Sequence, residues 1–144
     1  MKKIAERIEI LIGEYSEKIR TIPNDEFSLK AHSEKWSKKE ILGHLVDSAL
    51  NNSRRFVLGQ YEQEPKVDYD GPHWVLLSNY RDYERENLVQ LWTSLNLHIC
   101  RILENMSAEN YDRLCDSGDP ELRTLQWLAE DYVQHMLHHL KQLT

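Results

Sequence analysis

The chain has 144 residues, of which 40% are hydrophobic and 29% charged, and its formal net charge is −6 at pH 7. This length suggests one domain, residues 1–144, with a real buried core. The acidic balance argues against nucleic acid or an anionic membrane surface as the main partner. Glu6, Arg7 and Glu14 interrupt the apolar stretch that a signal peptide would need. Cys100 and Cys115 form no C-x-x-C pattern, so we expect free thiols in the cytoplasm.

The first two helices are predicted from apolar spacing and from a capping signal. Over residues 2–22, apolar residues recur at spacings of three and four and the pattern stops at Pro23. A loop is expected over 23–35. Ser37 then begins the second helix, because it can cap the N–H of Glu40 while Glu40 reaches back to the N–H of Ser37. This helix should run to about Gln60.

A polar stripe follows one side of that second helix. Beside its apolar arc, helical projection places four polar residues in a line: His44, Ser48, Asn51 and Arg55. A solvated flank tends to carry lysine and glutamate, whereas this stripe carries short hydrogen-bonding groups, a histidine and an arginine. A lone histidine there is more often structural than a ligand, but the composition as a whole favours the wall of a cleft.

The middle of the chain reads as a long connection followed by a third helix. Residues 61–83 are broken by Pro65, Gly71 and Pro72, with 74–77 able to form a short helix. A helix is predicted over 82–106. His98 lies at the edge of its apolar stripe, either as a further metal ligand or as a flank histidine bonded to solvent or a neighbour. Residues 107–114 can form one or two helical turns, and 116–123 read as a turn-rich linker.

The last helix, capped by Thr124 and running to Leu143, carries three of the seven histidines within five residues. At about 100° per residue, His139 projects into the apolar arc, His135 onto its edge and His138 onto the polar side. His135 and His139 have the i, i+4 spacing of metal ligands on a helix. An inward imidazole needs a hydrogen-bond partner or a metal, so the pattern leaves two interpretations, satisfied core histidines or metal ligands.

Four amphipathic helices without a convincing strand pattern predict an all-α four-helix bundle. The connections are long enough to cross the bundle, so simple up-and-down topology is not required. Ile10, Leu50 and Trp127 project away from the apolar arcs of their helices. They would suit the interface of a homodimer, although scattered exposed apolar residues are normal.

Three segments together resemble the DinB-like superfamily, and its YfiT-type members in particular. Residues 36–48, Trp-Ser-Lys-Lys-Glu-Ile-Leu-Gly-His-Leu-Val-Asp-Ser, followed by Asn51-Asn52 and Arg55-Phe56, resemble that family's second helix. Residues 132–140, Tyr-Val-Gln-His-Met-Leu-His-His-Leu, resemble its fourth helix. Tyr69-Asp70 with Trp74 also resembles the YfiT-type pattern, so the resemblance extends over nearly the whole chain.

The resemblance implies a four-helix bundle of up-down-down-up connectivity, with a long connection between the second and third helices. It also implies a divalent metal on three histidines, which match His44, His135 and His139 here. Zinc and nickel are the preferred metals, with iron as a third candidate. Three neutral nitrogens with open positions make a catalytic type of site rather than a closed structural one.

Members of this family include thiol-dependent transferases and isomerases, metal-dependent hydrolases and damage-inducible proteins. The resemblance therefore favours a metal-dependent enzyme that activates a low-molecular-weight thiol, or water, against a small electrophile. Ser48, Asn51 and Arg55 are the candidate substrate-binding residues, and Arg55 could bind a carboxylate; no general base is identified. The alternative is a non-catalytic bundle that a metal stabilises and whose surface serves oligomerisation or partner binding. A fourth protein ligand, such as His98, would favour that alternative.

Overall fold

The computed structural model describes residues 1–144. Its four long helices are α1 (Lys2–Thr21), α3 (Lys38–Leu58), α5 (Arg85–Asn105) and α6 (Leu125–Leu143). The shorter elements are the helices α2 (Asn24–Ser28) and α4 (Gly71–Ser78), the 3-10 turns η1 (Tyr80–Asp82) and η2 (Ala108–Asn110), and the strands β1 (Leu114–Cys115) and β2 (Arg123–Thr124). The predicted all-α four-helix bundle is confirmed.

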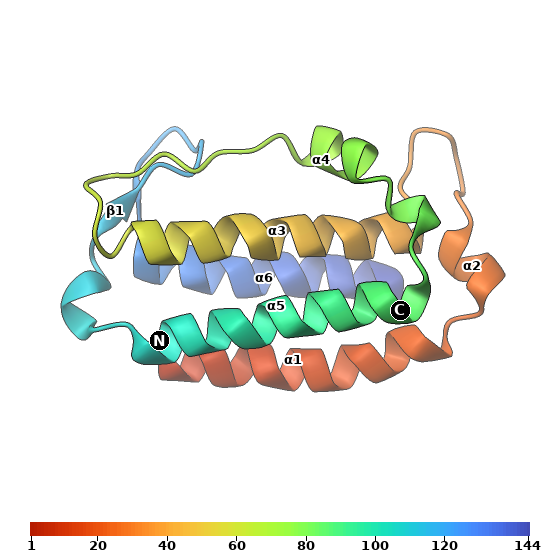
Figure 1. Ribbon diagram of the computed structural model, residues 1–144, viewed down its shortest axis with the longest axis horizontal. Helices are drawn as coiled ribbons and strands as arrows, with labels where there is room; N and C mark the ends of the chain where they lie inside the picture. Colours follow the sequence, from red (N-terminus) through yellow and green to blue (C-terminus); the bar gives the residue numbers. More distant parts are fainter.

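The bundle has up-down-down-up connectivity, as expected. Figure 1 shows α1 and α6 running in one direction and α3 and α5 in the other. Around the bundle, α1 and α3 each pack against both α5 and α6. Because α3 and α5 are parallel, residues 59–84 must return along the whole length of the bundle, and they carry α4 over the outer side of α3 (Figure 1).

Both predicted N-terminal caps are present. The Ser37 Oγ accepts a hydrogen bond from the Glu40 N–H at 3.2 Å, and a carboxylate oxygen of Glu40 accepts one from the Ser37 N–H at 2.8 Å. The Thr124 Oγ1 accepts from the Trp127 N–H at 3.1 Å. These side chains satisfy N–H groups that a helix start leaves without partners, and they set where α3 and α6 begin.

The apolar stripes of the four long helices meet in one core of 31 buried residues. Each fully buried Leu, Ile or Phe side chain contributes roughly 1.5–3 kcal/mol relative to an exposed one, so this core is the main source of stability. None of the helices combines the length and apolar character that a bilayer crossing requires.

The structure differs from the sequence-based expectation in two short segments. The predicted loop 23–35 contains α2, which is anchored by the fully buried Phe27. The predicted turn-rich linker 116–123 is present, but it connects two antiparallel strands that the sequence did not predict, with Leu114 paired to Thr124 and Cys115 to Arg123. Strands of two residues are too short to produce a visible alternation of apolar and polar residues.

Candidate metal centre

Three histidines from two helices converge on one point in the groove between α3 and α6. His44 comes from α3, and His135 and His139 come from adjacent turns of α6. Each offers one ring nitrogen, and these nitrogens all lie within 4.8 Å of one another. The Nε2 atoms of His44 and His135 are 3.2 Å apart. The structure therefore brings together the three residues that the sequence analysis singled out as metal ligands.

Neighbouring polar groups orient two of the three rings. The Nδ1 of His139 lies 3.0 Å from the amide oxygen of Gln142, and the Nδ1 of His135 lies 3.5 Å from the Ser48 hydroxyl. A histidine whose Nδ1 is engaged in this way presents its Nε2 to a metal. The Nδ1 of His44 is buried and has no hydrogen-bond partner.

The electrostatic surroundings keep the three imidazoles neutral. Burial, followed by the proximity of His135 and His139, lowers the pKa of His44 to about 3. Burial, followed by His139, His138 and Arg55, lowers the pKa of His135 to about 4. Burial also lowers the pKa of His139, against an opposing hydrogen bond to Gln142. Neutral imidazoles have the free lone pairs that metal coordination needs.

This donor set fits a divalent transition metal. The Nε2 atoms of His44 and His135 lie 3.2 Å apart, and when both rings carry their proton on Nδ1, the two Nε2 lone pairs can bind one shared cation. Imidazole nitrogen suits zinc, nickel, iron and copper. The cluster contains three protein ligands, and three is the number that catalytic zinc sites use while one position stays open.

Two further residues, Trp36 and Gly71, enclose the ring of His44. The sequence predicted neither of these contacts. The ring of Trp36 lies 4.9 Å from the ring of His44, centroid to centroid, whereas in the sequence Trp36 stood out only as part of the segment that resembles the family's second helix. A Cβ on Gly71 would lie 3.4 Å from the His44 ring, so the first residue of α4 packs directly on it. From the sequence alone, Gly71 indicates only a break in the connection.

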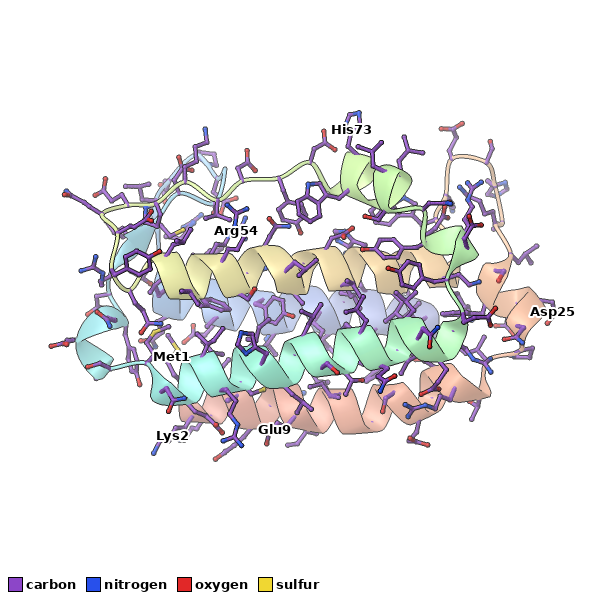
Figure 2. The ribbon with its side chains drawn as sticks, in the orientation of Figure 1. Met1, Lys2, Glu9, Asp25, Arg54 and His73 are labelled. Carbon is purple, nitrogen blue, oxygen red and sulfur yellow. The ribbon has the colours of Figure 1, made fainter.

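The remaining candidate histidines lie outside the cluster. His138 is exposed and its Nε2 lies 3.1 Å from the Gln142 amide nitrogen. His98 is exposed on α5 and is not among the clustered residues. His73 points away from the bundle on α4, as Figure 2 shows, and its Nδ1 is 2.8 Å from the Asp70 carboxylate.

A charged cavity of about 190 Å³ adjoins His135 on one side of the cluster. Ser48 and Arg55 from the predicted polar stripe line this cavity. The third residue of the predicted set, Asn51, does not: it is fully buried, and its amide nitrogen donates to the Asp47 carbonyl at 2.9 Å. The neighbouring Asn52 takes the cavity position instead.

A second, broader cavity of about 710 Å³ lies on the other side of the cluster. Its lining includes Trp36, Ile41, Pro72 and Gln142. On α3, Ile41 precedes His44 whereas Ser48 and Arg55 follow it, and on the antiparallel α6 the order is reversed (Figure 1). The histidine cluster therefore lies between the two cavities along the α3–α6 groove.

Comparison with known proteins agrees with this architecture. A "putative metal-dependent hydrolase" of Halalkalibacterium halodurans is 29% identical over 126 residues, which cover 85% of this chain and 73% of that protein. The structure of YfiT from Bacillus subtilis, which has "an unusual four-helix bundle topology", superimposes with a TM-score of 0.87 at 20% identity, over 98% of this chain and 83% of YfiT. A mycothiol-dependent maleylpyruvate isomerase has a TM-score of 0.80 at 11% identity, over 98% of this chain and 59% of the isomerase.

The name of the Halalkalibacterium halodurans relative describes that protein as metal-dependent, and the histidine cluster of this chain has the composition of a metal site. The sequence profile of the DinB superfamily matches residues 8–143. That match includes most of α1, the whole of the other three long helices and each of the three clustered histidines, and so this chain belongs to the DinB superfamily.

Proposed function

We propose that the protein is a metal-dependent enzyme that activates a low-molecular-weight thiol, or water, for attack on a small electrophile. The observation that carries this proposal is the convergence of three neutral imidazoles, with no fourth protein ligand, between two cavities. When bound there, a divalent metal supplies Lewis acidity, which lowers the pKa of a coordinated thiol or water toward neutrality.

The side chains of the groove prepare the site for this chemistry. Gln142 and Ser48 hold the rings of His139 and His135 with their Nε2 atoms inward. Trp36 and Gly71 restrict the ring of His44. The charged cavity is suited to the polar part of one reactant. The broader cavity, which Glu34 and Lys35 line together with Trp36 and Ile41, is suited to an electrophile with both polar and apolar parts. Reactants held on both sides would meet at the histidines, and such positioning is a large part of catalysis.

Metal binding is tested with protein that carries no histidine tag. After chelator treatment, equilibrium dialysis against zinc or nickel and elemental analysis should find one divalent ion per chain. His139→Ala should abolish tight binding, because it removes one of three ligands. His138→Ala is the matched control and should leave binding nearly intact, because His138 is exposed outside the cluster. Equal losses in the two variants would contradict the assignment.

Turnover is tested by a screen of thiols against electrophiles. Glutathione, bacillithiol and mycothiol should be offered with halogenated aromatics, epoxides and maleyl compounds, beside ester and amide hydrolysis assays. Consumption of an electrophile should require metal-loaded protein, and the loss of activity in His139→Ala should follow the loss of metal. Acceleration by a thiol would separate the transferase form of the proposal from the hydrolase form.

The alternative is a non-catalytic bundle that the metal stabilises, with exposed apolar residues such as Ile10, Leu50 and Trp127 available for oligomerisation. That role predicts a higher melting temperature with metal, by mass action, and no turnover in either screen. The three-residue ligand set and the adjoining cavities favour the enzyme.

A further inference from the structure

The charged cavity beside His135 contains a cation, the Arg55 guanidinium, that forms no direct ion pair with a carboxylate. The Arg55 guanidinium donates from Nε to the Val67 carbonyl at 3.0 Å, from Nη2 to the Ser117 carbonyl at 3.1 Å and from Nη1 to the Asn52 amide oxygen at 3.4 Å. All three acceptors are neutral, and Arg55 forms no ion pair. These bonds use three of its five N–H groups. The guanidinium also lies 5.9 Å from the centroid of the Tyr69 ring, and two donors remain for a ligand.

The facing helix contributes an anion that is also without a partner. Asp131 on α6 lines the same cavity and forms neither a hydrogen bond nor an ion pair. The other carboxylate of the lining is different. Asp119 lies 3.5 Å from the Arg123 guanidinium and accepts a hydrogen bond from the Ser117 hydroxyl. Asp131 is thus the free negative charge of this cavity.

One cation and one anion therefore line the same cavity, close enough to attract each other but without a direct ion pair. An anionic ligand would pair with Arg55 but place its negative charge near Asp131. A cationic ligand would pair with Asp131 but place its positive charge near Arg55. A ligand with a carboxylate and an ammonium group satisfies both, and charge-assisted hydrogen bonds of this kind are about twice as strong as neutral ones. We infer that the cavity binds the α-amino-acid group of a small molecule, its carboxylate on Arg55 and its ammonium on Asp131.

The position of these charges indicates how such a ligand lies. Asp131 precedes His135 by four residues, or about 6 Å along the helix, and Arg55 follows Ser48 by seven residues, or about 10 Å. A volume of about 190 Å³ is below the roughly 300–1,000 Å³ of cavities for drug-sized ligands, so it suits one head group. The rest of the molecule would extend toward the histidines, and in that respect the inference rests on the proposed function.

The test measures binding rather than turnover, with zinc-loaded protein and isothermal titration calorimetry. The probe is S-methylglutathione, whose γ-glutamyl end carries an ammonium and a carboxylate and whose blocked sulfur is not a thiol. Its N-acetyl derivative carries a neutral acetamide in place of the ammonium group. Wild-type protein should bind the first about tenfold more tightly than the second, as one charge-assisted hydrogen bond predicts.

Asp131→Asn should remove this preference while leaving the affinity for the N-acetyl derivative unchanged. Asp131 is suitable because it is exposed and makes no bond that folding requires. Asp25→Asn is the matched control for net charge, since Asp25 lies on α2 at the other end of the bundle (Figure 2), and it should keep the wild-type preference.

Three outcomes would overturn the inference: equal affinity for the two probes, no binding of either, or a preference that Asp131→Asn does not change. These outcomes are separate from failure of the proposed function. Catalytic turnover without the head-group preference would leave the enzyme proposal standing and reject this one. A preference for the ammonium-bearing probe without any turnover in the screens would support this inference and reject the enzyme proposal.

Discussion

At the scale of single residues, Gln142 decides which nitrogen of His139 faces the cluster. Its amide oxygen lies 3.0 Å from His139 Nδ1, so the proton of a neutral ring stays on that atom and Nε2 keeps its lone pair. We expect Gln142→Ala to weaken zinc binding by roughly 10–100-fold, the usual effect of removing such a supporting hydrogen bond. Competition titration with a chromogenic chelator measures this affinity.

Gln134 on the same helix provides the control for Gln142. It is exposed and lies outside both cavities, so Gln134→Ala should leave zinc affinity unchanged. An unchanged affinity in Gln142→Ala would mean that packing alone orients the His139 ring.

At the scale of elements, the contact of η1 with α3 holds the long crossing connection in place. A Cβ on Gly43 would lie 2.1 Å from the Tyr80 ring, which therefore needs a glycine beneath it. Alanine is the better helix former by about 1 kcal/mol, yet we expect Gly43→Ala to lower the free energy of unfolding by about 1–3 kcal/mol through overpacking. Urea denaturation followed by circular dichroism measures the change.

Gly13 gives the opposite result from the same substitution. It lies inside α1 and nothing stands within 4 Å of an added Cβ, so Gly13→Ala should raise the free energy of unfolding by roughly 0.5–1 kcal/mol. If both variants were stabilised, the Tyr80 ring would be free to move aside and would not fix the connection.

At the scale of the whole molecule, Asp47 makes stability depend on pH. Asp47 is fully buried, its Oδ1 accepts from the Tyr80 hydroxyl at 2.5 Å and its Oδ2 has no partner. Burial raises the pKa of this carboxyl from 3.8 to about 6, against the opposing hydrogen bond from Tyr80. Between these pH values the folded chain holds a proton that the unfolded chain has lost, so this stabilising contribution is present below about pH 4 and is lost as pH rises through about 6.

Asp47→Asn keeps an acceptor for Tyr80 and removes the titration. The wild type loses stability as pH rises and the variant does not. The free energy of unfolding of the variant minus that of the wild type should therefore be larger at pH 8 than at pH 4, by on the order of 1–3 kcal/mol. Urea titrations at the two pH values measure this difference, and the neutral histidines affect both proteins equally. The exposed Asp25→Asn should show no such dependence. If the free energies of unfolding of Asp47→Asn and wild type differed by the same amount at both pH values, the Asp47 carboxyl would not titrate in this range.

Much of the fold was predictable because its signals are local. Helical periodicity and the caps at Ser37 and Thr124 depend on residues within one or two turns. The i, i+4 spacing places His135 and His139 on one face of α6 whatever the helix packs against. Together with the family resemblance, these signals sufficed for the bundle, its connectivity and the three histidines that gather in it.

Only the tertiary structure decided which neighbours complete the site. A helical projection placed Asn51 in the polar stripe, but the rotation of α3 about its axis buries Asn51 and turns Asn52 toward the cavity. Asp131 faces the Arg55 cavity because α3 and α6 are antiparallel and aligned at His44 and His135. Rotation and alignment between helices result from core packing over the whole bundle, and no short segment of the sequence encodes them.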